Sequence, residues 1–441
     1  MSETSDERIV LAGEKALELW RQGKDAWNKW VEEHPEADVY FFGTDFSKER
    51  NVKDVNVISF RDFLFPSGEI SFCGATFGAG DVDFSEAEFG AGDIDFSHTI
   101  FGEGYVDFSD ASIGEGDVDF SYTKFGEGRV DFSHTKFGEG YVDFSETEFG
   151  AGDIDFSHTR FGEGYVDFSY ASIGEGDVDF SHTVFKSNVL FETLNHVSRV
   201  YSFSFRHTVF DGPLEISTNH GEAFSCVPDF TGTKTTHHVS LEGLKCNFPR
   251  QYSKFIRNAP SKFWTFKGNW LGQKIAIDPE DGERLRRLKE LAENNKDHQK
   301  ALDFHIMEMK AMRKFKPSKW WPLPLLINSE FWFDKLSDYG RSIERPFTVL
   351  LFVWVIFAWI YALCSAFFTQ SFNYISSLVF SGTQILPFVP IGRSARSQTA
   401  EMLFNSPDIP LFIYFFAFGQ SIISLVLIFL IGLALKHRFK L

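Results

Sequence analysis

Nine consecutive units of twelve residues run without a gap from Phe77 to Val184: FGAGDVDFSEAE (77–88), FGAGDIDFSHTI (89–100), FGEGYVDFSDAS (101–112), IGEGDVDFSYTK (113–124), FGEGRVDFSHTK (125–136), FGEGYVDFSETE (137–148), FGAGDIDFSHTR (149–160), FGEGYVDFSYAS (161–172) and IGEGDVDFSHTV (173–184). Repetition at a fixed period is the sequence signature of a solenoid. Weaker copies flank these units on both sides, so we expect the solenoid to span residues 38–250.

The spacing within one unit favours strands over helices. Val82 and Phe84 are two residues apart and point to one side of a strand, while Asp83 points to the other. The next apolar residue, Phe89, comes five residues later, which does not fit a helical period. We therefore expect a β-helix with Val, Phe and Thr or Ala inside and Asp, Glu and His outside. The paired glycines of each unit mark a corner, through positive φ or close backbone approach.

Charge is distributed unevenly along the 441 residues. The chain has 61 acidic and 43 basic residues, but residues 77–184 alone hold 25 acidic and 4 basic ones. The rest of the chain is therefore close to neutral. Four cysteines, at positions 73, 226, 246 and 364, are too few for a disulfide scaffold and favour a reducing compartment. The N-terminus has no apolar run, so we expect no cleaved secretory signal.

Two long uncharged segments near the C-terminus predict membrane-spanning helices. Residues 347–368 and 409–435 each exceed the roughly 20 residues that cross a bilayer. Arg341 and Arg345 precede the first segment, and Lys436, Arg438 and Lys440 follow the second. Because positive residues mark the cytoplasmic side, we expect a multi-pass protein of the cell inner membrane with both termini and the solenoid in the cytoplasm.

The segment between these helices, YISSLVFSGTQILPFVP (374–390), is apolar but too short to span. It is either a re-entrant pore helix that ends at Pro387 or an interfacial loop on the outer face. The second spanning segment holds a polar cluster near its middle, Gln420, Ser421 and Ser424. Such groups either line an aqueous pore or bond a neighbouring helix. We predict pore lining, with Leu427 and Ile428 as an apolar constriction one turn further on.

Two five-residue stretches, VDFSH and TKFGE, resemble the pentapeptide repeat. The resemblance implies a right-handed, four-sided β-helix with two units in each 24-residue coil; one unit per coil is the alternative. Four flanking segments extend it, namely 23–35, 283–313, 336–346 and 433–441. They are similar to bacterial pentapeptide-repeat proteins with a C-terminal two-helix ion-channel-like domain. This family implies a helical cap (1–37), the solenoid (38–250), a linker with an amphipathic helical hairpin (251–345) and a transmembrane domain (346–441).

The favoured functional hypothesis is an oligomeric ion channel with a cytoplasmic sensing or assembly domain. One helical hairpin cannot enclose a pore, so we expect an oligomer, with four subunits as the usual solution. The analogy with known channel effectors implies an antiphage role, with a nucleotide or oligonucleotide signal and a partner nucleotidyltransferase. Basic and aromatic residues after the solenoid suit such a ligand or anionic lipid: Lys254, Arg257, Lys262, Trp264, Lys267 and Trp270.

Two other classes remain. One is a membrane-tethered scaffold that binds a protein partner and conducts nothing. The other is a DNA mimic, because some acidic β-helices imitate a duplex. The recurring histidines, His98, His134, His158 and His182, are expected to form an outward ladder rather than a metal site. No catalytic arrangement and no cofactor motif stands out in the sequence, so we do not expect an enzyme.

Overall fold

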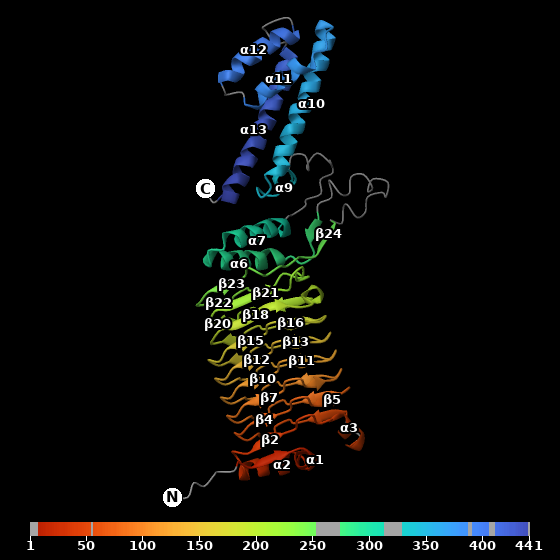
Figure 1. Ribbon diagram of the computed structural model, residues 1–441, viewed down its shortest axis with the longest axis vertical. Helices are drawn as coiled ribbons and strands as arrows, with labels where there is room; N and C mark the ends of the chain where they lie inside the picture. Colours follow the sequence, from red (N-terminus) through yellow and green to blue (C-terminus); the bar gives the residue numbers. More distant parts are fainter. Residues whose placement is uncertain are drawn as a thin grey trace. The chain divides into compact units, whose positions relative to one another are not determined.

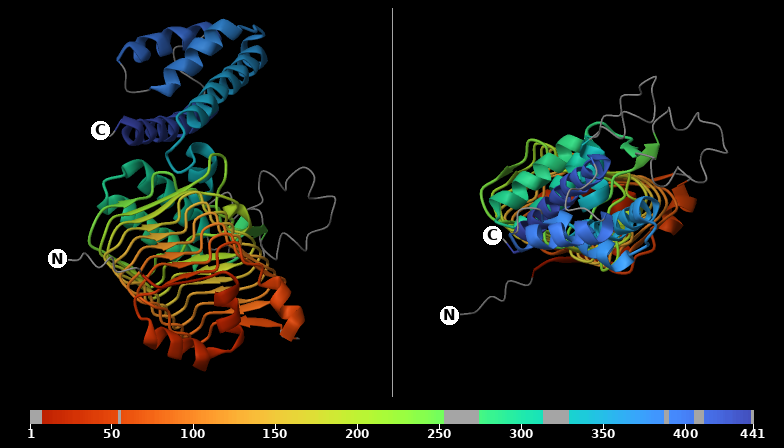
Figure 2. Two further views of the ribbon diagram at one scale, coloured as in Figure 1. Left: turned by 60° about the horizontal axis from the view of Figure 1, so that its bottom comes forward. Right: turned by 90° about the horizontal axis from the view of Figure 1, so that it is seen from above.

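The computed structural model describes residues 8–53, 56–252, 274–312, 329–386, 390–404 and 411–439. The chain divides into two compact units, Met1–Phe315 and Lys316–Leu441. The first contains stacked parallel strands with helices at both ends of the stack, and the second is helical (Figures 1 and 2).

Four columns of short parallel strands build the first unit. The ten-stranded sheet contains, in spatial order, β1 (Val10–Ala12), β2 (Asp38–Tyr40), β4 (Ile70–Ser71), β7 (Ile94–Asp95), β10 (Val118–Asp119), β12 (Val142–Asp143), β15 (Val166–Asp167), β18 (Val189–Leu194), β21 (Leu214–Thr218) and β23 (Val239–Ser240). The seven-stranded sheet contains β19 (Ser202–Ser204), β16 (Asp177–Asp179), β13 (Ile154–Asp155), β11 (Val130–Asp131), β9 (Val106–Asp107), β6 (Asp81–Asp83) and β3 (Val57–Ser59).

Two smaller sheets complete the coils. One contains β14 (Arg160–Phe161), β17 (Val184–Phe185), β20 (Val209–Phe210) and β22 (Lys234–Thr235), and the other pairs β5 (Thr76–Gly78) with β8 (Ile100–Phe101). Single bridges such as Lys136 with Arg160 and Lys124 with Glu148 extend these two columns. An antiparallel pair, β24 (Arg250–Tyr252) with β25 (Lys274–Ala276), follows the last coil.

The strand register sets the length of one coil. Val118 pairs with Ile94 on one side and with Val142 on the other, always 24 residues away. Each coil therefore uses two twelve-residue units, and the alternative of one unit per coil is wrong. The flanking coils differ slightly in length, as in the pairs Val166 with Val189 and Val189 with Leu214. Parallel strands that return once per coil make the first unit a β-solenoid.

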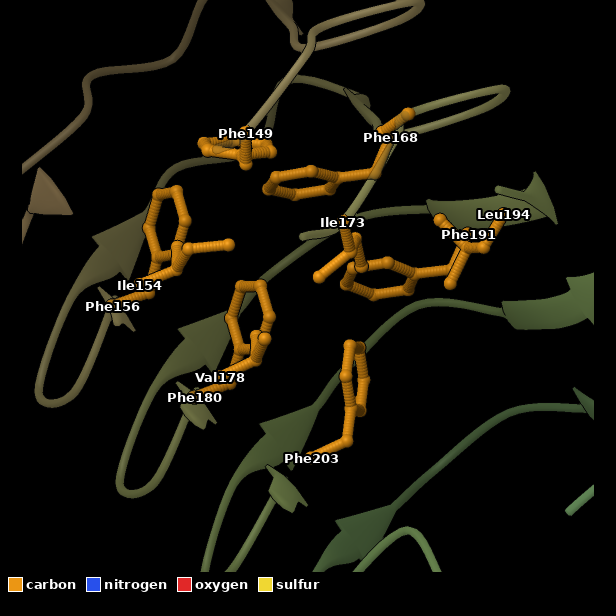
Figure 3. Close-up of a pocket in the computed structure, with 11 residues that line it drawn as sticks. Phe149, Ile154, Phe156, Phe168, Ile173, Val178, Phe180, Phe191, Leu194 and Phe203 are labelled. Carbon is orange, nitrogen blue, oxygen red and sulfur yellow. The ribbon is translucent and has the colours of Figure 1, made fainter. Parts of the chain in front are cut away.

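Phenylalanine ladders fill the interior of the solenoid, as predicted from the spacing. Phe108 is 1% exposed and stacks on Phe84 and Phe132, with ring centroids 4.8 and 4.9 Å away. Thr135 is buried beside it, and its hydroxyl donates to the Phe108 carbonyl at 2.7 Å. Figure 3 shows the same inward arrangement in later coils, where Ile173 interrupts a ladder and an apolar void of about 10 Å³ remains.

The glycines of the repeat allow adjacent coils to approach each other. A Cβ atom built on Gly126 would lie 2.1 Å from the Gly102 carbonyl oxygen, and one on Gly102 would lie 1.7 Å from that of Gly78. Real Cβ atoms do not approach backbone oxygens so closely. Close backbone approach, rather than positive φ, therefore explains most of the paired glycines; Gly78 itself has a φ of 78°.

Helices close the N-terminal end of the stack. Helix α1 (Glu14–Arg21) and helix α2 (Lys24–Glu33) place Trp20 and Trp27 over the first coil, and α3 (Ser47–Lys53) follows β2. The indole nitrogens donate to the carbonyls of Ser59 and Leu64, at 3.1 and 2.8 Å. Because an open solenoid end exposes unpaired strand groups and apolar side chains, these helices act as a cap.

A second pair of helices covers the C-terminal coil. Helix α6 (Asp281–Asn294) and helix α7 (His298–Ala311) pack against each other, and Leu285, Leu288 and Leu291 join the solenoid core. The 3₁₀ turn η1 (Val197–Arg199) lies within the last coils. The Asn295 side chain accepts from the Val239 amide at 2.9 Å, and the Asp297 carboxylate caps α7 by accepting from Lys300 N at 3.0 Å. The predicted amphipathic hairpin therefore packs on the solenoid end.

The described residues of the second unit contain the helices α9 (Ser329–Ser337), α10 (Glu344–Thr369), α11 (Tyr374–Ile385), α12 (Pro390–Phe404) and α13 (Leu411–Phe439). Two of them, α10 and α13, are long and apolar enough to cross a membrane. Most of their large apolar side chains are exposed in the single chain, which is typical of helices that face lipid or other subunits.

Candidate functional site

Helix α11 lies beside the central part of α10. The Trp354 indole donates to the Leu378 carbonyl at 2.9 Å, and the Ser381 hydroxyl donates to the Trp354 carbonyl at 2.8 Å. Trp354 follows Glu344 by ten residues, which places it about 15 Å along α10 at 1.5 Å per residue. This is roughly half the thickness of a bilayer core of about 30 Å. The C-terminal half of α11 therefore reaches the middle of the apolar span.

Both ends of the hairpin formed by α11 and α12 meet the same turn of α10. The Ser365 hydroxyl contacts the Ser371 carbonyl before α11 at 3.0 Å and the Leu403 carbonyl at the end of α12 at 2.8 Å. The Asn373 side chain begins α11 by accepting from Ser376 N at 3.1 Å. The chain thus enters and leaves this hairpin at one end of α10, while the tip of α11 reaches halfway along it.

A buried hydrogen-bond network joins α10, α11 and α13. The Gln420 amide donates to the carbonyl and to the hydroxyl of Ser381, at 3.0 and 2.8 Å, and its oxygen accepts from the Tyr361 hydroxyl at 2.9 Å. The Ser421 hydroxyl contacts the Gln384 carbonyl at 3.1 Å. Polar groups in an apolar span need partners, and here neighbouring helices of the same chain supply them.

The five residues predicted to line a pore occupy two positions around α13. Gln420, Ser424 and Leu427 are buried within the single chain, whereas Ser421 and Ile428 are half-exposed on one flank of the same helix. For Gln420 the contacts match the alternative stated above, a bond to a neighbouring helix. Ser421 and Ile428 are seven residues apart and share a face that a second chain or water can reach.

Two buried polar atoms in the described part of this unit lack a hydrogen-bond partner. Ser424 Oγ and Gln384 Oε1 are buried and, within the described residues, have no hydrogen-bond partner. Leaving such an atom unpaired costs about 1–3 kcal/mol. These atoms add to the polar character of the region where α11 meets α13.

The other predicted site residues fall outside this region. The basic and aromatic group Lys254, Arg257, Lys262, Trp264, Lys267 and Trp270 lies outside the described residues. In the part of the chain that the structure describes, no three His, Cys, Asp or Glu side chains are grouped to hold a metal ion. The recurring histidines are exposed on the solenoid surface.

Sequence reasoning missed the partners of the polar cluster, namely Tyr361, Ser365 and Ser381. One signal was present in the sequence: Ser377, Ser381 and Gln384 follow each other at intervals of four and three residues and form the buried side of α11. No family model, curated protein or solved structure matches the chain. The functional argument therefore depends on the fold and the contacts described above.

Proposed function

We propose that the protein is an oligomeric membrane channel whose β-solenoid is a cytoplasmic sensing or assembly domain. The observation that carries the proposal is the α11–α12 hairpin, which enters and leaves at one end of α10 and reaches the middle of its span. In this proposal the hairpin is re-entrant and brings the C-terminal end of α11, whose last carbonyls have no partner within the helix, to membrane depth. A helix end at that depth is tolerated where it is buried in protein or lines a water-filled cavity.

In this proposal the pore runs along the flank of α13 that carries Ser421 and Ile428. Ser421 connects this flank to the C-terminal end of α11 through the Gln384 carbonyl. Ile428 continues the same flank toward the C-terminus and forms an apolar constriction that closes the path by dewetting. One chain cannot surround such a path, so several copies assemble, and four is the usual number for this layout.

The remaining parts of the proposal rest on the sequence and, for the gating signal and the defence role, on the analogy with channel effectors. The positive flanks place both termini and the solenoid in the cytoplasm of a bacterial cell with the helices in its inner membrane. The solenoid is of the pentapeptide type and right-handed, and the protein is not an enzyme. A nucleotide or oligonucleotide signal made by a partner nucleotidyltransferase opens the pore during antiphage defence.

Ion flux from liposomes that contain the purified full chain tests the channel. We expect Ile428→Ser to increase flux without any stimulus, because a hydroxyl wets the constriction. Ile423→Ser is the matched control, since Ile423 is exposed on the opposite flank of α13. Equal flux from both variants would place the path elsewhere. If neither variant nor the native chain passes ions, the channel proposal fails.

A tethered scaffold is the second candidate, and the capped, acidic solenoid favours it. Helices close both ends of the stack, so its side walls are the surfaces available to a partner. A scaffold does not need to conduct ions. The absence of ion flux from the liposomes, together with a specific protein partner, would support it. DNA mimicry is the weakest of the three, because a membrane anchor does not serve a soluble decoy; binding of basic DNA enzymes to the chain would revive it.

A further inference from the structure

One corner of the solenoid stacks histidines from successive coils. His134, His158 and His182 lie 24 residues apart, and neighbouring ring centroids are 4.8 Å apart with the rings nearly parallel. The stack continues to His207 at 5.1 Å. Each of the first three residues has a φ near 60°, which turns its side chain out at the corner. The coil spacing therefore produces a regular row of imidazoles on the surface.

A groove of about 440 Å³ follows this row, in the size range of small-molecule sites. Its lining residues are Asp110, His134, Lys136, His158, Arg160, His182 and Val184. Lys136 and Arg160 pair in adjacent coils, so their side chains leave the same wall one coil apart. Both are exposed.

The two cations of the groove differ from the other basic residues of the repeats. Lys124 pairs with Glu148 at 3.0 Å, and Arg129 pairs with Asp155 at 2.6 Å. Within the described residues, no carboxylate lies within 4 Å of Lys136 or Arg160. A segment with 25 acidic residues thus leaves its two unpaired cations next to each other, beside three histidines.

We propose that this groove binds the phosphate groups of a soluble oligophosphate, with Lys136 and Arg160 as the cationic contacts and the histidine row as additional N–H donors. Imidazoles 4.8 Å apart and two cations one coil apart match an extended chain of phosphates better than a single compact anion. Charge-assisted hydrogen bonds from Arg and Lys are the strong contacts that phosphate oxygens form. This inference rests on the proposed function, because it assigns a ligand to the sensing domain. The binding of phosphate itself does not require ion conduction.

The histidines make binding depend on pH. His158 interacts with His134 and His182 in its stack and with Asp155 and Asp179 nearby. The other charged side chains that line the groove are Asp110, Lys136 and Arg160. Partial desolvation within the stack and the two neighbouring imidazoles lower the pKa of His158. A bound polyanion favours protonated imidazole and raises this pKa. Binding therefore takes up protons, and affinity rises as the pH falls.

Isothermal titration calorimetry of the full chain in phosphatidylcholine nanodiscs tests the proposal, with inorganic triphosphate as the probe at constant ionic strength. We expect Lys136→Gln with Arg160→Gln to weaken binding about tenfold or more, because charged contacts are lost. Lys124→Gln with Lys186→Gln removes the same charge from residues that pair with Glu148 and Glu139. This control is expected to bind almost normally. Equal losses in the two double variants would overturn the site.

A second arm tests the histidine row. Affinity at pH 6 is expected to exceed affinity at pH 7.5, and replacing His134, His158 and His182 by Asn should remove this difference. Asn tolerates positive φ, so the corner is retained. Affinity that does not change with pH in the native chain contradicts the role of the row.

Two further outcomes decide the ligand class. Tighter binding of an acidic peptide than of triphosphate would contradict the assignment to phosphate. Loss of triphosphate binding in phosphatidylglycerol nanodiscs would give the groove to lipid headgroups instead of a soluble ligand, and unchanged binding supports the soluble ligand. None of these measurements depends on ion flux. The absence of conduction and the absence of triphosphate binding are therefore separate results.

Discussion

The solenoid and the helical second unit bury side chains under different constraints. In the twelve-residue repeats of the solenoid, a Phe such as Phe108 stacks on its equivalents 24 residues away, and the pattern of inside and outside follows the strand period. In α10 and α13, nearly every side chain is apolar, and hydrophobicity does not distinguish the packed side from the exposed side. There the few polar residues, such as Tyr361 and Gln420, mark the packed side. Repetition specifies the first region, and rare polar contacts specify the second.

The largest expected effect is a buried charge in the Phe ladder. Phe108→Asp places a carboxylate between Phe84 and Phe132 without a partner, and we expect a loss of about 4 kcal/mol or more in the free energy of unfolding. Urea unfolding of the full chain in detergent, followed by circular dichroism, measures it. Ile100→Asp is the control, because Ile100 points outward and is exposed. A fully stable Phe108→Asp variant would contradict the inward assignment.

Glycine substitutions compare the two regions directly. Gly126→Ala forces a Cβ against the Gly102 carbonyl oxygen, and we expect a loss of about 1–3 kcal/mol as the coils are pushed apart. Gly419→Ala in α13 meets no atom within 4 Å, and it should be neutral or stabilise that helix by about 0.5–1 kcal/mol. Thermal unfolding of both variants gives the comparison. Similar effects at the two positions would mean that coil spacing does not require glycine.

At the C-terminal cap of the solenoid, where the repeats end, we expect the stability of α6 to depend on pH. Asp281 is buried with one carboxylate oxygen unpartnered, and burial together with the Asp278 charge raises its pKa to about 6, opposed by Arg284. The folded chain therefore holds a proton that the unfolded chain releases above about pH 4. This contribution weakens the packing of α6 as the pH rises from about 4 to 6.

Hydrogen exchange of the α6 amides, corrected for intrinsic rates, measures this effect. We expect stronger protection at pH 5 than at pH 7.5 in the native chain. Asp281→Asn should increase protection at pH 7.5, by about 1–2 kcal/mol, and reduce the pH dependence. The prediction fails if protection rises with pH in the native chain and is unchanged by Asp281→Asn. Other carboxylates would then control the pH dependence of α6.

The smallest effect is expected in the polar network of the helical second unit. Gln420→Leu leaves the Tyr361 hydroxyl without its acceptor, and a double-mutant cycle with Tyr361→Phe should give a coupling of about 0.6–1.7 kcal/mol. Unfolding in mixed detergent micelles supplies the four free energies. Phe418→Leu, on the exposed side of α13, is the matched control. A coupling near zero would mean that packing, not this hydrogen bond, holds α10 against α13.

The sequence alone determined the solenoid, its inward Phe and Thr residues and two helices that are long and apolar enough to span a membrane. These conclusions follow from local periods and segment lengths, because strand alternation and bilayer thickness act on consecutive residues. The 24-residue coil came with the resemblance to pentapeptide repeats, while spacing alone left twelve and twenty-four open. Strand pairing decided this question, since it depends on which distant residues meet.

Only the tertiary structure decided the roles of the polar residues. Gln420 and Ser421 are neighbours in sequence, yet one is buried against Tyr361 and Ser381 and the other borders an accessible flank. A helix that is apolar on all sides has no period from which its packed side can be read. The unpaired state of Lys136 and Arg160 was equally hidden, because their neighbours are the same positions in the next coil, 24 residues away. Spatial adjacency, set by the fold, gives these side chains their partners.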